Sequence, residues 1–312
     1  MTDPFSIELI APSGFPPEHA LARGIERLRS AGHEVRNAQA GQRRFQRFAG
    51  TVAERVAEIN RLADPSHPLP DLVMAVRGGY GVHQVLASLD YEGLRARFGS
   101  APCPIVGHSD ISALSMALLA RAGVPSVAGP MLAYDFGGDT MSEFTQRAFW
   151  ALMAGESGPA RWHSGTEAMA CEGVLWGGNL AVLCALLGTP YLPQVDGGIL
   201  FVEDIAEPAF RIERLLMQLH LAGVLGRQRA LILGDFAGMR ADAYDPAYDL
   251  DVVAARIAEV AGIPVVRGLP FGHCPDKLSL PIGVTAQLSV DEAGLACLGF
   301  ASPWSARPTQ TT

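Results

Sequence analysis

Long hydrophobic runs are absent from this sequence. No apolar segment approaches the roughly 20 residues that a helix needs to cross a bilayer. The opening stretch, MTDPFSIELIAPSGF, has no basic segment followed by a long apolar run and a small-residue cleavage site, so we expect neither a signal peptide nor an anchor. The sequence therefore predicts a cytoplasmic protein with no membrane partner.

Positive charge is also scarce. Lysine and arginine number 24 against 32 aspartates and glutamates, the formal net charge is −8, and no basic run is longer than the pair Arg43-Arg44. A phosphate backbone is recognised by clustered basic side chains. We therefore expect no nucleic-acid partner.

Cysteine spacing excludes two further classes of protein. The five cysteines are odd in number, widely scattered and free of CxxC spacing. This pattern indicates neither a disulfide framework nor a zinc knuckle. It fits a reducing cytoplasm, and we expect no bound metal and no other cofactor.

The sequence does contain an alternation of strands and helices. A strand at 7–11, a helix at 17–31 and a strand at 33–37 form the repeating unit of a parallel sheet. A helix at 51–63, a strand at 72–76 and a helix from about Val82 continue the pattern. Near residue 160 the chain becomes polar and turn-rich, as in a linker. The 312 residues therefore predict an α/β protein with an N-terminal parallel domain, 1–160, and a smaller α+β domain, 161–312.

One serine lies at a position typical of nucleophiles. Ser109 stands in the segment Gly107-His108-Ser109-Asp110, between a short apolar strand at 104–106 and a helix-like stretch at 111–122. A serine at such a turn has an exposed hydroxyl beside the first free N–H groups of the helix, which can stabilise an oxyanion. A plain helix N-cap is the alternative interpretation.

A serine nucleophile needs a base, usually a histidine that a carboxylate orients. Of eight histidines, His273 differs because glycine and proline fix the backbone of its loop, 268–273. We interpret His108, adjacent to the serine, as a packing residue. Glu203 and Asp204 follow the strand 199–202, and either could orient a histidine, although a solvated acidic turn is the alternative. The order serine, acid, histidine is one of several found in catalytic triads.

A glycine-rich turn follows the strand 72–76. In open parallel sheets, ligands bind where strands end and helices begin, and the segment Arg77-Gly78-Gly79-Tyr80-Gly81 is such a point. A nucleotide-binding function is the weaker interpretation, because the run lacks the Walker lysine and does not match GxGxxG.

Several segments together resemble the LD-carboxypeptidase family of serine peptidases, and the similarity runs nearly from end to end. Because many motifs occur in order, the resemblance is more specific than any single motif. The segments are IAPSG (10–14), AVRGGYG (75–81), GHSD (107–110), GPM (129–131), LWGGNL (175–180), GILFVEDIAEPAFRIERLLMQL (198–219), GLPFGH (268–273) and DKLSLPIG (276–283).

The resemblance implies a fold and a set of roles. It implies an N-terminal parallel α/β domain of the flavodoxin or glutamine-amidotransferase type, and a C-terminal domain with β-barrel-like character. It implies that Ser109 is the nucleophile, His273 the general base and Glu203 the orienting carboxylate. The family substrate is a murein tetrapeptide, cleaved without metal between meso-diaminopimelate and a terminal D-alanine in peptidoglycan recycling. The family also suggests a homodimer.

The implied reaction needs further contacts. We expect the backbone N–H groups of Asp110 and Gly79 to form the oxyanion hole, and Arg77 is the candidate for the terminal carboxylate of the peptide, with a structural ion pair as the alternative. The other candidate substrate-binding residues are Gly78, Tyr80, Trp176 and Asn179.

Two other functions stay open. The same family contains self-immunity enzymes that hydrolyse a peptide-nucleotide antibiotic with the same triad. The segments 48–51 and 244–250 favour the recycling branch by resemblance. A binding module that has lost turnover is a third hypothesis, and the intact Ser109, Glu203 and His273 disfavour it.

Overall fold

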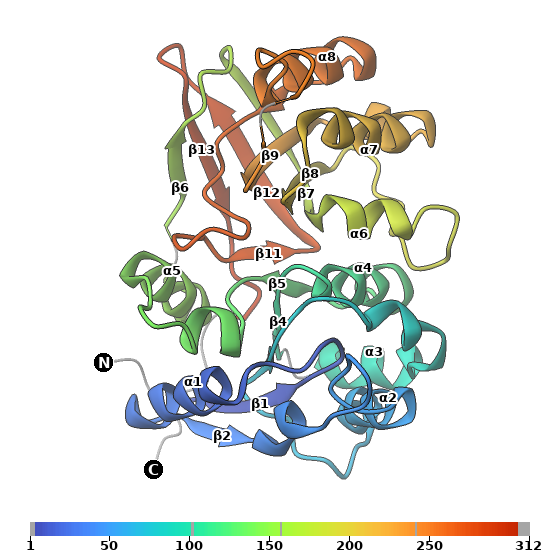
Figure 1. Cartoon of the computed structure of the whole chain (residues 1–312), viewed down its shortest axis with the longest axis vertical. Coiled ribbons are helices and arrows are strands. Elements are labelled where there is room, and N and C mark those ends of the chain that lie inside the picture. Colours follow the sequence, from blue (N-terminus) through green and yellow to red (C-terminus); the bar gives the residue numbers. More distant parts are fainter. Residues whose placement is uncertain (1–3, 101–102, 157, 241, 305–312) are drawn as a thin grey trace.

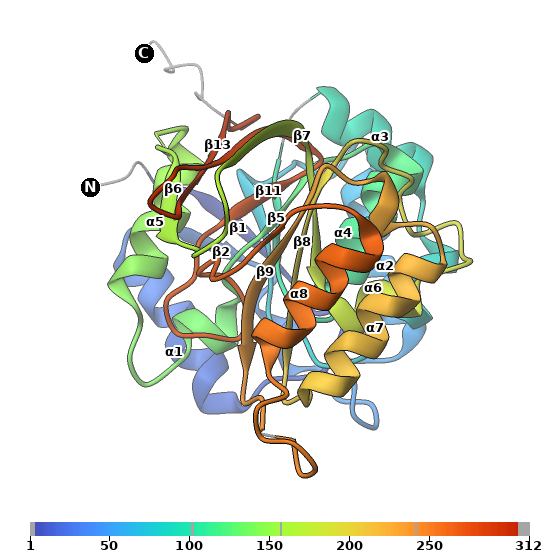
Figure 2. The same ribbon diagram turned by 90° about the horizontal axis from the view of Figure 1, so that it is seen from above.

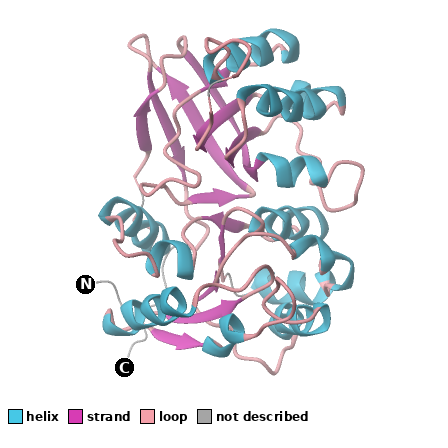
Figure 3. Cartoon of the chain, in the orientation of Figure 1, coloured by secondary structure: helices cyan, strands magenta, loops and turns pink. Residues whose placement is uncertain are grey.

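The computed structural model describes residues 4–100, 103–156, 158–240 and 242–304. Two β-sheets follow one another along the longest axis of the molecule, and helices flank both (Figure 1). The colouring by secondary structure separates the two sheets and their helices (Figure 3). The α/β prediction is confirmed.

The first sheet is built largely from the first half of the chain, and its strand order is β11-β5-β4-β3-β1-β2. Strands β1 to β5 run parallel, in the order 2-1-3-4-5 of flavodoxin-like folds. The sixth strand, β11, comes from the second half and pairs antiparallel with β5. The strands are β1 (Ser6–Ile10), β2 (Glu34–Arg36), β3 (Leu72–Ala75), β4 (Ile105–Gly107), β5 (Ser126–Ala128) and β11 (Leu280–Ile282).

Helices cover both faces of this sheet. On one face α1 (Glu18–Ser30) and α5 (Glu143–Ala154) pack over the strands, and on the other lie α2 (Val52–Asn60), α3 (Tyr91–Ser100) and α4 (Ile111–Ala122). The prediction of a helix starting near Val82 is wrong. The segment forms two short 3₁₀ turns, Val82–Gln84 and Leu86–Ser88, because the N–H of Val82 binds the Asp110 carboxylate at 3.0 Å and fixes the turn.

The second sheet is mixed and strongly curled (Figure 2). Its order is β10-β9-β8-β7-β12-β13-β6, parallel from β10 to β7 and antiparallel from β7 to β6. Helices α6 (Leu180–Ala185), α7 (Ala209–Leu221) and α8 (Leu250–Ala261) lie along one side (Figure 1). The strands are β6 (Ala160–His163), β7 (Met169–Asn179), β8 (Ile199–Ile205), β9 (Ala230–Ala237), β10 (Val265–Val266), β12 (Val284–Val290) and β13 (Leu295–Phe300).

One hydrophobic cluster spans the two sheets, and a second lies between the first sheet and helices α1 and α5. Helix α4 is buried along most of its length, and it packs against α6 and β7 of the second half as well as against β4 and β5. A helix that is apolar all round needs cover on every side, and α4 has it. The second sheet begins with β6 at Ala160, next to the predicted linker, but β11 returns to the first sheet.

Within the described residues, no helix combines the length and the apolar character that a bilayer crossing requires.

Candidate active site

Ser109 lies in the turn between β4 and α4, with a backbone φ of 61°. A positive φ is uncommon for residues with a side chain and costs about 1–2 kcal/mol. Such a strained strand-to-helix turn raises a serine above the sheet, as in nucleophile elbows. The backbone at Ser109 therefore has the geometry that the sequence predicted for a nucleophile.

The glycine turn after β3 lies against this serine. A Cβ atom added to Gly78 would be 2.8 Å from the Cβ and 3.0 Å from the Oγ of Ser109, and 3.5 Å from the Asp110 backbone nitrogen. Gly79 is different, because an added Cβ would meet nothing within 4 Å and its φ is 110°. Close packing against Ser109 therefore requires glycine at 78, and the positive φ favours glycine at 79.

His273 and Glu203 meet although 70 residues separate them. The Nδ1 atom of His273 lies 2.7 Å from Oε2 of Glu203. Glu203 is fully buried near the end of β8, and the His273 side chain is 10% exposed. The carboxylate therefore fixes the ring orientation and leaves Nε2 as the nitrogen that can exchange a proton with a hydroxyl.

The structure distinguishes the two carboxylates at the end of β8. Asn179, paired with Glu203 in the sheet register, donates from Nδ2 to Glu203 Oε1 at 3.2 Å and to Asp204 Oδ1 at 3.0 Å. Asp204 also accepts the backbone N–H groups of Ile205 and Ala181. Burial raises the pKa of Asp204, although these hydrogen bonds act to lower it. Glu203 contacts His273, whereas Asp204 holds the start of α6.

His108 is buried beside the candidate triad. Its Nδ1 lies 2.9 Å from the carbonyl oxygen of Gly129, and its ring centroid is 5.3 Å from that of His273. Burial, with the nearby charge of Lys277, lowers the pKa of His108 well below its usual value. A neutral ring therefore fills the space between the serine turn and the His273 loop, which agrees with the prediction of a packing residue.

A buried carboxylate, Asp110, holds the two turns together. Its Oδ2 accepts the Ser13 hydroxyl at 2.6 Å and the Val82 N–H at 3.0 Å. The buried guanidinium of Arg55 donates to the carbonyls of Pro12 and Gly81. The sequence analysis missed the roles of Ser13 and Arg55. For Ser13 a signal existed, because Ser13-Gly14 follows a strand that is parallel to β4.

The predicted substrate contacts occupy different environments. Arg77 and Tyr80 are exposed, and Arg77 donates to the carbonyl of Phe15 at 2.5 Å. Trp176 is 1% exposed and donates from its indole nitrogen to Gln228, so its prediction as a substrate contact is wrong. Its strand lies between β8 and β12 and buries it in the core. Asn179 is buried and committed to the two carboxylates.

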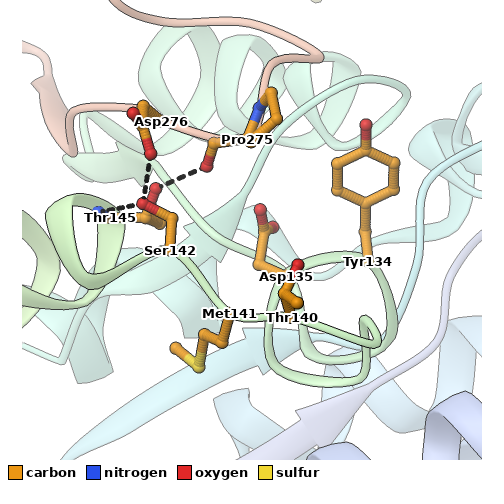
Figure 4. Close-up of a pocket in the computed structure, with 8 residues that line it drawn as sticks. All are labelled: Tyr134, Asp135, Thr140, Met141, Ser142, Thr145, Pro275 and Asp276. Atoms are coloured by element: carbon orange, nitrogen blue, oxygen red, sulfur yellow. Dashed lines mark hydrogen bonds between the residues drawn. The ribbon is translucent and has the colours of Figure 1, made fainter.

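A cavity of about 430 Å³ lies beside the His273 loop (Figure 4). It lies between the segments 134–145 and 275–276 of the two halves of the chain. The sequence analysis gave no site residue in either segment, although Asp276 begins the segment 276–283 of the family resemblance. In the part of the chain that the structure describes, no group of three or more histidine, cysteine or acidic side chains is arranged to hold a metal ion.

Family models match both halves of the chain. Residues 7–129 match the LD-carboxypeptidase N-terminal domain, and residues 172–288 match the LD-carboxypeptidase C-terminal domain. A Streptomyces coelicolor protein that is named as a carboxypeptidase is 36% identical over 93% of this chain and 92% of its own length. The murein tetrapeptide carboxypeptidase of Pseudomonas aeruginosa is 32% identical over 90% of this chain and 92% of its own.

Solved structures of similar proteins match the chain along nearly its whole length. The crystal structure of a muramoyltetrapeptide carboxypeptidase from Oxalobacter formigenes is 38% identical and covers 96% of this chain and all of its own, with a TM-score of 0.88. The microcin C7 self-immunity protein shares the fold at a TM-score of 0.80 but only 23% identity, over 96% of this chain and 97% of its own. With matches across both halves, the chain belongs to the LD-carboxypeptidase family and is a serine carboxypeptidase.

Proposed function

We propose that this enzyme releases the terminal D-alanine of murein tetrapeptides by hydrolysing the bond after meso-diaminopimelate. The observation that carries the proposal is the Glu203 and His273 pair, 2.7 Å apart. The His273 ring lies 5.3 Å, between centroids, from that of His108, the residue before Ser109, whose φ is positive. The names of relatives from Pseudomonas aeruginosa and Oxalobacter formigenes support the substrate class.

The proposed reaction uses Ser109 as the nucleophile. Its Oγ attacks the carbonyl carbon before D-alanine, and its proton passes to Nε2 of His273. Collapse of the tetrahedral intermediate breaks the C–N bond, and the imidazolium gives the proton to the leaving amine. Water then attacks the carbonyl carbon of the acyl-enzyme while Nε2 of His273 takes its proton. The imidazolium gives that proton to Oγ of Ser109 as the ester C–O bond breaks. Glu203 stabilises the imidazolium that forms at each stage, because it is buried and already bound to Nδ1.

The backbone N–H groups of Asp110 and Gly79 are the proposed oxyanion donors. The Asp110 nitrogen and the Ser109 hydroxyl border the same space beside Gly78. Preorganised donors of this kind typically contribute about 10²–10³ in rate each. A side chain at position 78 would fill that space, so we also retain Gly78 as a position where the substrate approaches the backbone.

An exopeptidase must recognise a free carboxylate, and we propose Arg77 for that task. It is exposed at the edge of the glycine turn, and Tyr80 in the same turn has 45% of its surface exposed. The single bond from Arg77 Nη1 to the Phe15 carbonyl leaves other N–H donors of the guanidinium for an anion.

The decisive experiment measures D-alanine release from purified murein tetrapeptide, with and without a chelator. We expect release that the chelator does not change, and no release would contradict the proposal. A peptide-nucleotide conjugate assayed in parallel tests the self-immunity alternative, which the likeness to the microcin C7 protein keeps in view. Binding of the tetrapeptide without turnover would instead favour the binding module.

Replacement of the nucleophile is the matched control. We expect Ser109→Ala to lower kcat by several orders of magnitude, as in other triads, while the protein stays folded by circular dichroism. Turnover that survives this change would show that the nucleophile is another residue.

We further propose that the enzyme acts in the cytoplasm as a homodimer. Sedimentation velocity on the full chain measures the oligomeric state directly, and a species of monomer mass across the working concentration range would contradict the dimer.

A further inference from the structure

The chain has one lysine, Lys277, and it is completely buried. All other basic side chains, apart from the histidines, are arginines. The Lys277 ammonium pairs with the buried carboxylate of Asp135, and its Nζ lies 4.6 Å from the centroid of the Tyr134 ring. This ion pair joins the second half of the chain to the π-helical turn Leu132–Phe136 of the first half.

Tyr134 connects this pair to His273. Its hydroxyl donates to the backbone carbonyl of His273 at 3.1 Å. The ring is 46% exposed, so packing alone does not fix it, and the ammonium on its face supplies a cation–π contact. Asp135 in turn accepts the Met131 N–H at 2.7 Å, which fixes the carboxylate within its own turn.

The rest of the His273 segment is tied to the first half as well. Thr145 donates to the carbonyl of Pro275 at 2.8 Å and accepts the N–H of Lys277 at 2.9 Å, and Ser142 bonds to Asp276. Figure 4 shows Pro275 and Asp276 reaching the start of α5, with Tyr134 and Asp135 across the cavity. Four of the five residues from His273 to Lys277 therefore bond to side chains of the half that carries Ser109.

A buried ion pair is not by itself a source of stability, because desolvation of two charges offsets much of their attraction. A fixed geometry is what such a pair can supply. Glu203 controls the direction of the His273 ring from within the second half, but it does not fix the distance from that ring to a serine in the other half. The contacts of Lys277, Asp135 and Tyr134 do cross between the halves at this point.

We propose that Lys277, Asp135 and Tyr134 are positioning residues that hold the His273 loop in register with Ser109. The inference rests on the proposed function only in requiring that His273 activates Ser109. None of the three side chains takes part in proton transfer. Replacing any of them should therefore lower kcat and the reactivity of Ser109 and leave the affinity for the peptide unchanged.

The test compares Tyr134→Phe with Tyr91→Phe. Each removes one tyrosine hydroxyl bound to a backbone carbonyl, but the partner of Tyr91 is Leu86, away from His273. We measure kcat and KM for D-alanine release, the melting temperature, and the rate at which a fluorophosphonate probe labels Ser109. The probe reports serine activation without a peptide substrate.

We expect Tyr134→Phe to lower kcat and the labelling rate by about fivefold to tenfold, as the loss of one hydrogen bond would, with KM within twofold of the native value. Tyr91→Phe should leave both rates unchanged. Lys277→Met should lower both rates further, and adding Tyr134→Phe to it should have little additional effect, because the ring is already released. Lys277→Arg, which keeps the charge, should recover part of the loss.

Other results would overturn the inference. An unchanged kcat and labelling rate in Tyr134→Phe would overturn the inference. This result would count even if Lys277→Met failed to fold, because Tyr134→Phe keeps the ring and the ion pair. A raised KM at constant kcat would make Tyr134 a substrate contact. If the native enzyme is labelled but releases no D-alanine, the proposed function fails while the labelling rates still decide the positioning role. If D-alanine is released but the native serine is not labelled, kcat alone decides the positioning role. If neither release nor labelling occurs, both proposals fail.

Discussion

Ser109 combines a functional side chain with an unfavourable backbone conformation. Its φ of 61° lies in the left-handed region, and the neighbouring Asp110 carboxylate, bound to Ser13 and Val82, fixes the turn in which it occurs. Strain of this kind persists where the surrounding structure determines it, and it clusters at sites of function. Because a serine is unfavourable in this backbone conformation, its presence here indicates a function for its hydroxyl.

Ser109→Gly should accordingly abolish turnover and stabilise the fold. Relief of the left-handed conformation, less the greater chain entropy of glycine, predicts a gain of about 0.5–1 kcal/mol in the free energy of unfolding. Ala120→Gly in α4, at an ordinary helical position, should lose about 1 kcal/mol. Urea denaturation of both variants measures the difference, and equal losses would contradict the strain argument.

His108 predicts a pH dependence of stability. Because burial lowers its pKa, the folded state excludes a proton that the unfolded chain binds below its ordinary value of about 6.5. Stability from this group is complete above that pH, and it decreases as the pH falls through about 6.5 toward the lowered value, by at most about 1.4 kcal/mol per pH unit.

His108→Asn, whose Nδ2 can take the place of Nδ1 in the bond to Gly129, should reduce the loss of melting temperature between pH 7.5 and 5. The exposed His19 offers a control, and His19→Asn should keep the native pH dependence. A pH dependence that is the same in both variants would show that His108 does not contribute.

Among the elements, the glycine turn after β3 sets the space around the nucleophile. Gly78→Ala would place a Cβ 2.8 Å from the Cβ of Ser109. Displacement of a catalytic group by about 1 Å can cost about 10² in rate, so we expect kcat/KM to fall by about that factor. Gly99→Ala in α3, where an added Cβ meets nothing within 4 Å, should leave kcat/KM unchanged. Normal activity in Gly78→Ala would mean that the turn can move away at little cost.

Elements with a clear period were predictable from the sequence. Helix α4 occupies the predicted range 111–122, since Gly123 ends it in the left-handed conformation. Strand β11 was not predicted, because three residues carry no periodic signal and their pairing with β5 spans about 150 positions of the chain. Its proline, Pro281, is compatible with the sheet because β11 lies at an edge.

The same distinction applies to the site. Ser109 follows a strand, Glu203 lies near the end of one, and His273 lies in a glycine-rich turn, and such positions carry a local signal. Tyr134 and Asp135 lie in none of the segments of the family resemblance, and Lys277 lies in the segment 276–283 with no role implied for it, so only the folded chain brings the three together. Trp176 was a candidate substrate contact, but β7 lies between two other strands of the second sheet and the tryptophan side chain is buried, which only the fold reveals.

The whole molecule is expected to unfold as one unit. Helix α4 packs against both sheets, β11 completes the first sheet from the second half, and the His273 segment is bonded to the first half. We therefore expect a single calorimetric transition with equal calorimetric and van't Hoff enthalpies.

A fragment of residues 1–160 supplies the complementary test. It would expose the apolar surface of α4 that faces α6 and leave the β5 edge unpaired, so it should show no cooperative transition. Two separate transitions in the full chain, with a stable fragment, would show that the halves fold independently.

The late position of β11 has a consequence for biosynthesis. The ribosome releases residues 280–282 long after strands β1 to β5, so the nascent first half waits through about half of translation with an open sheet edge. Exposed edges of that kind favour aggregation. We expect chaperone dependence during synthesis to exceed that of the finished protein during refolding at low concentration.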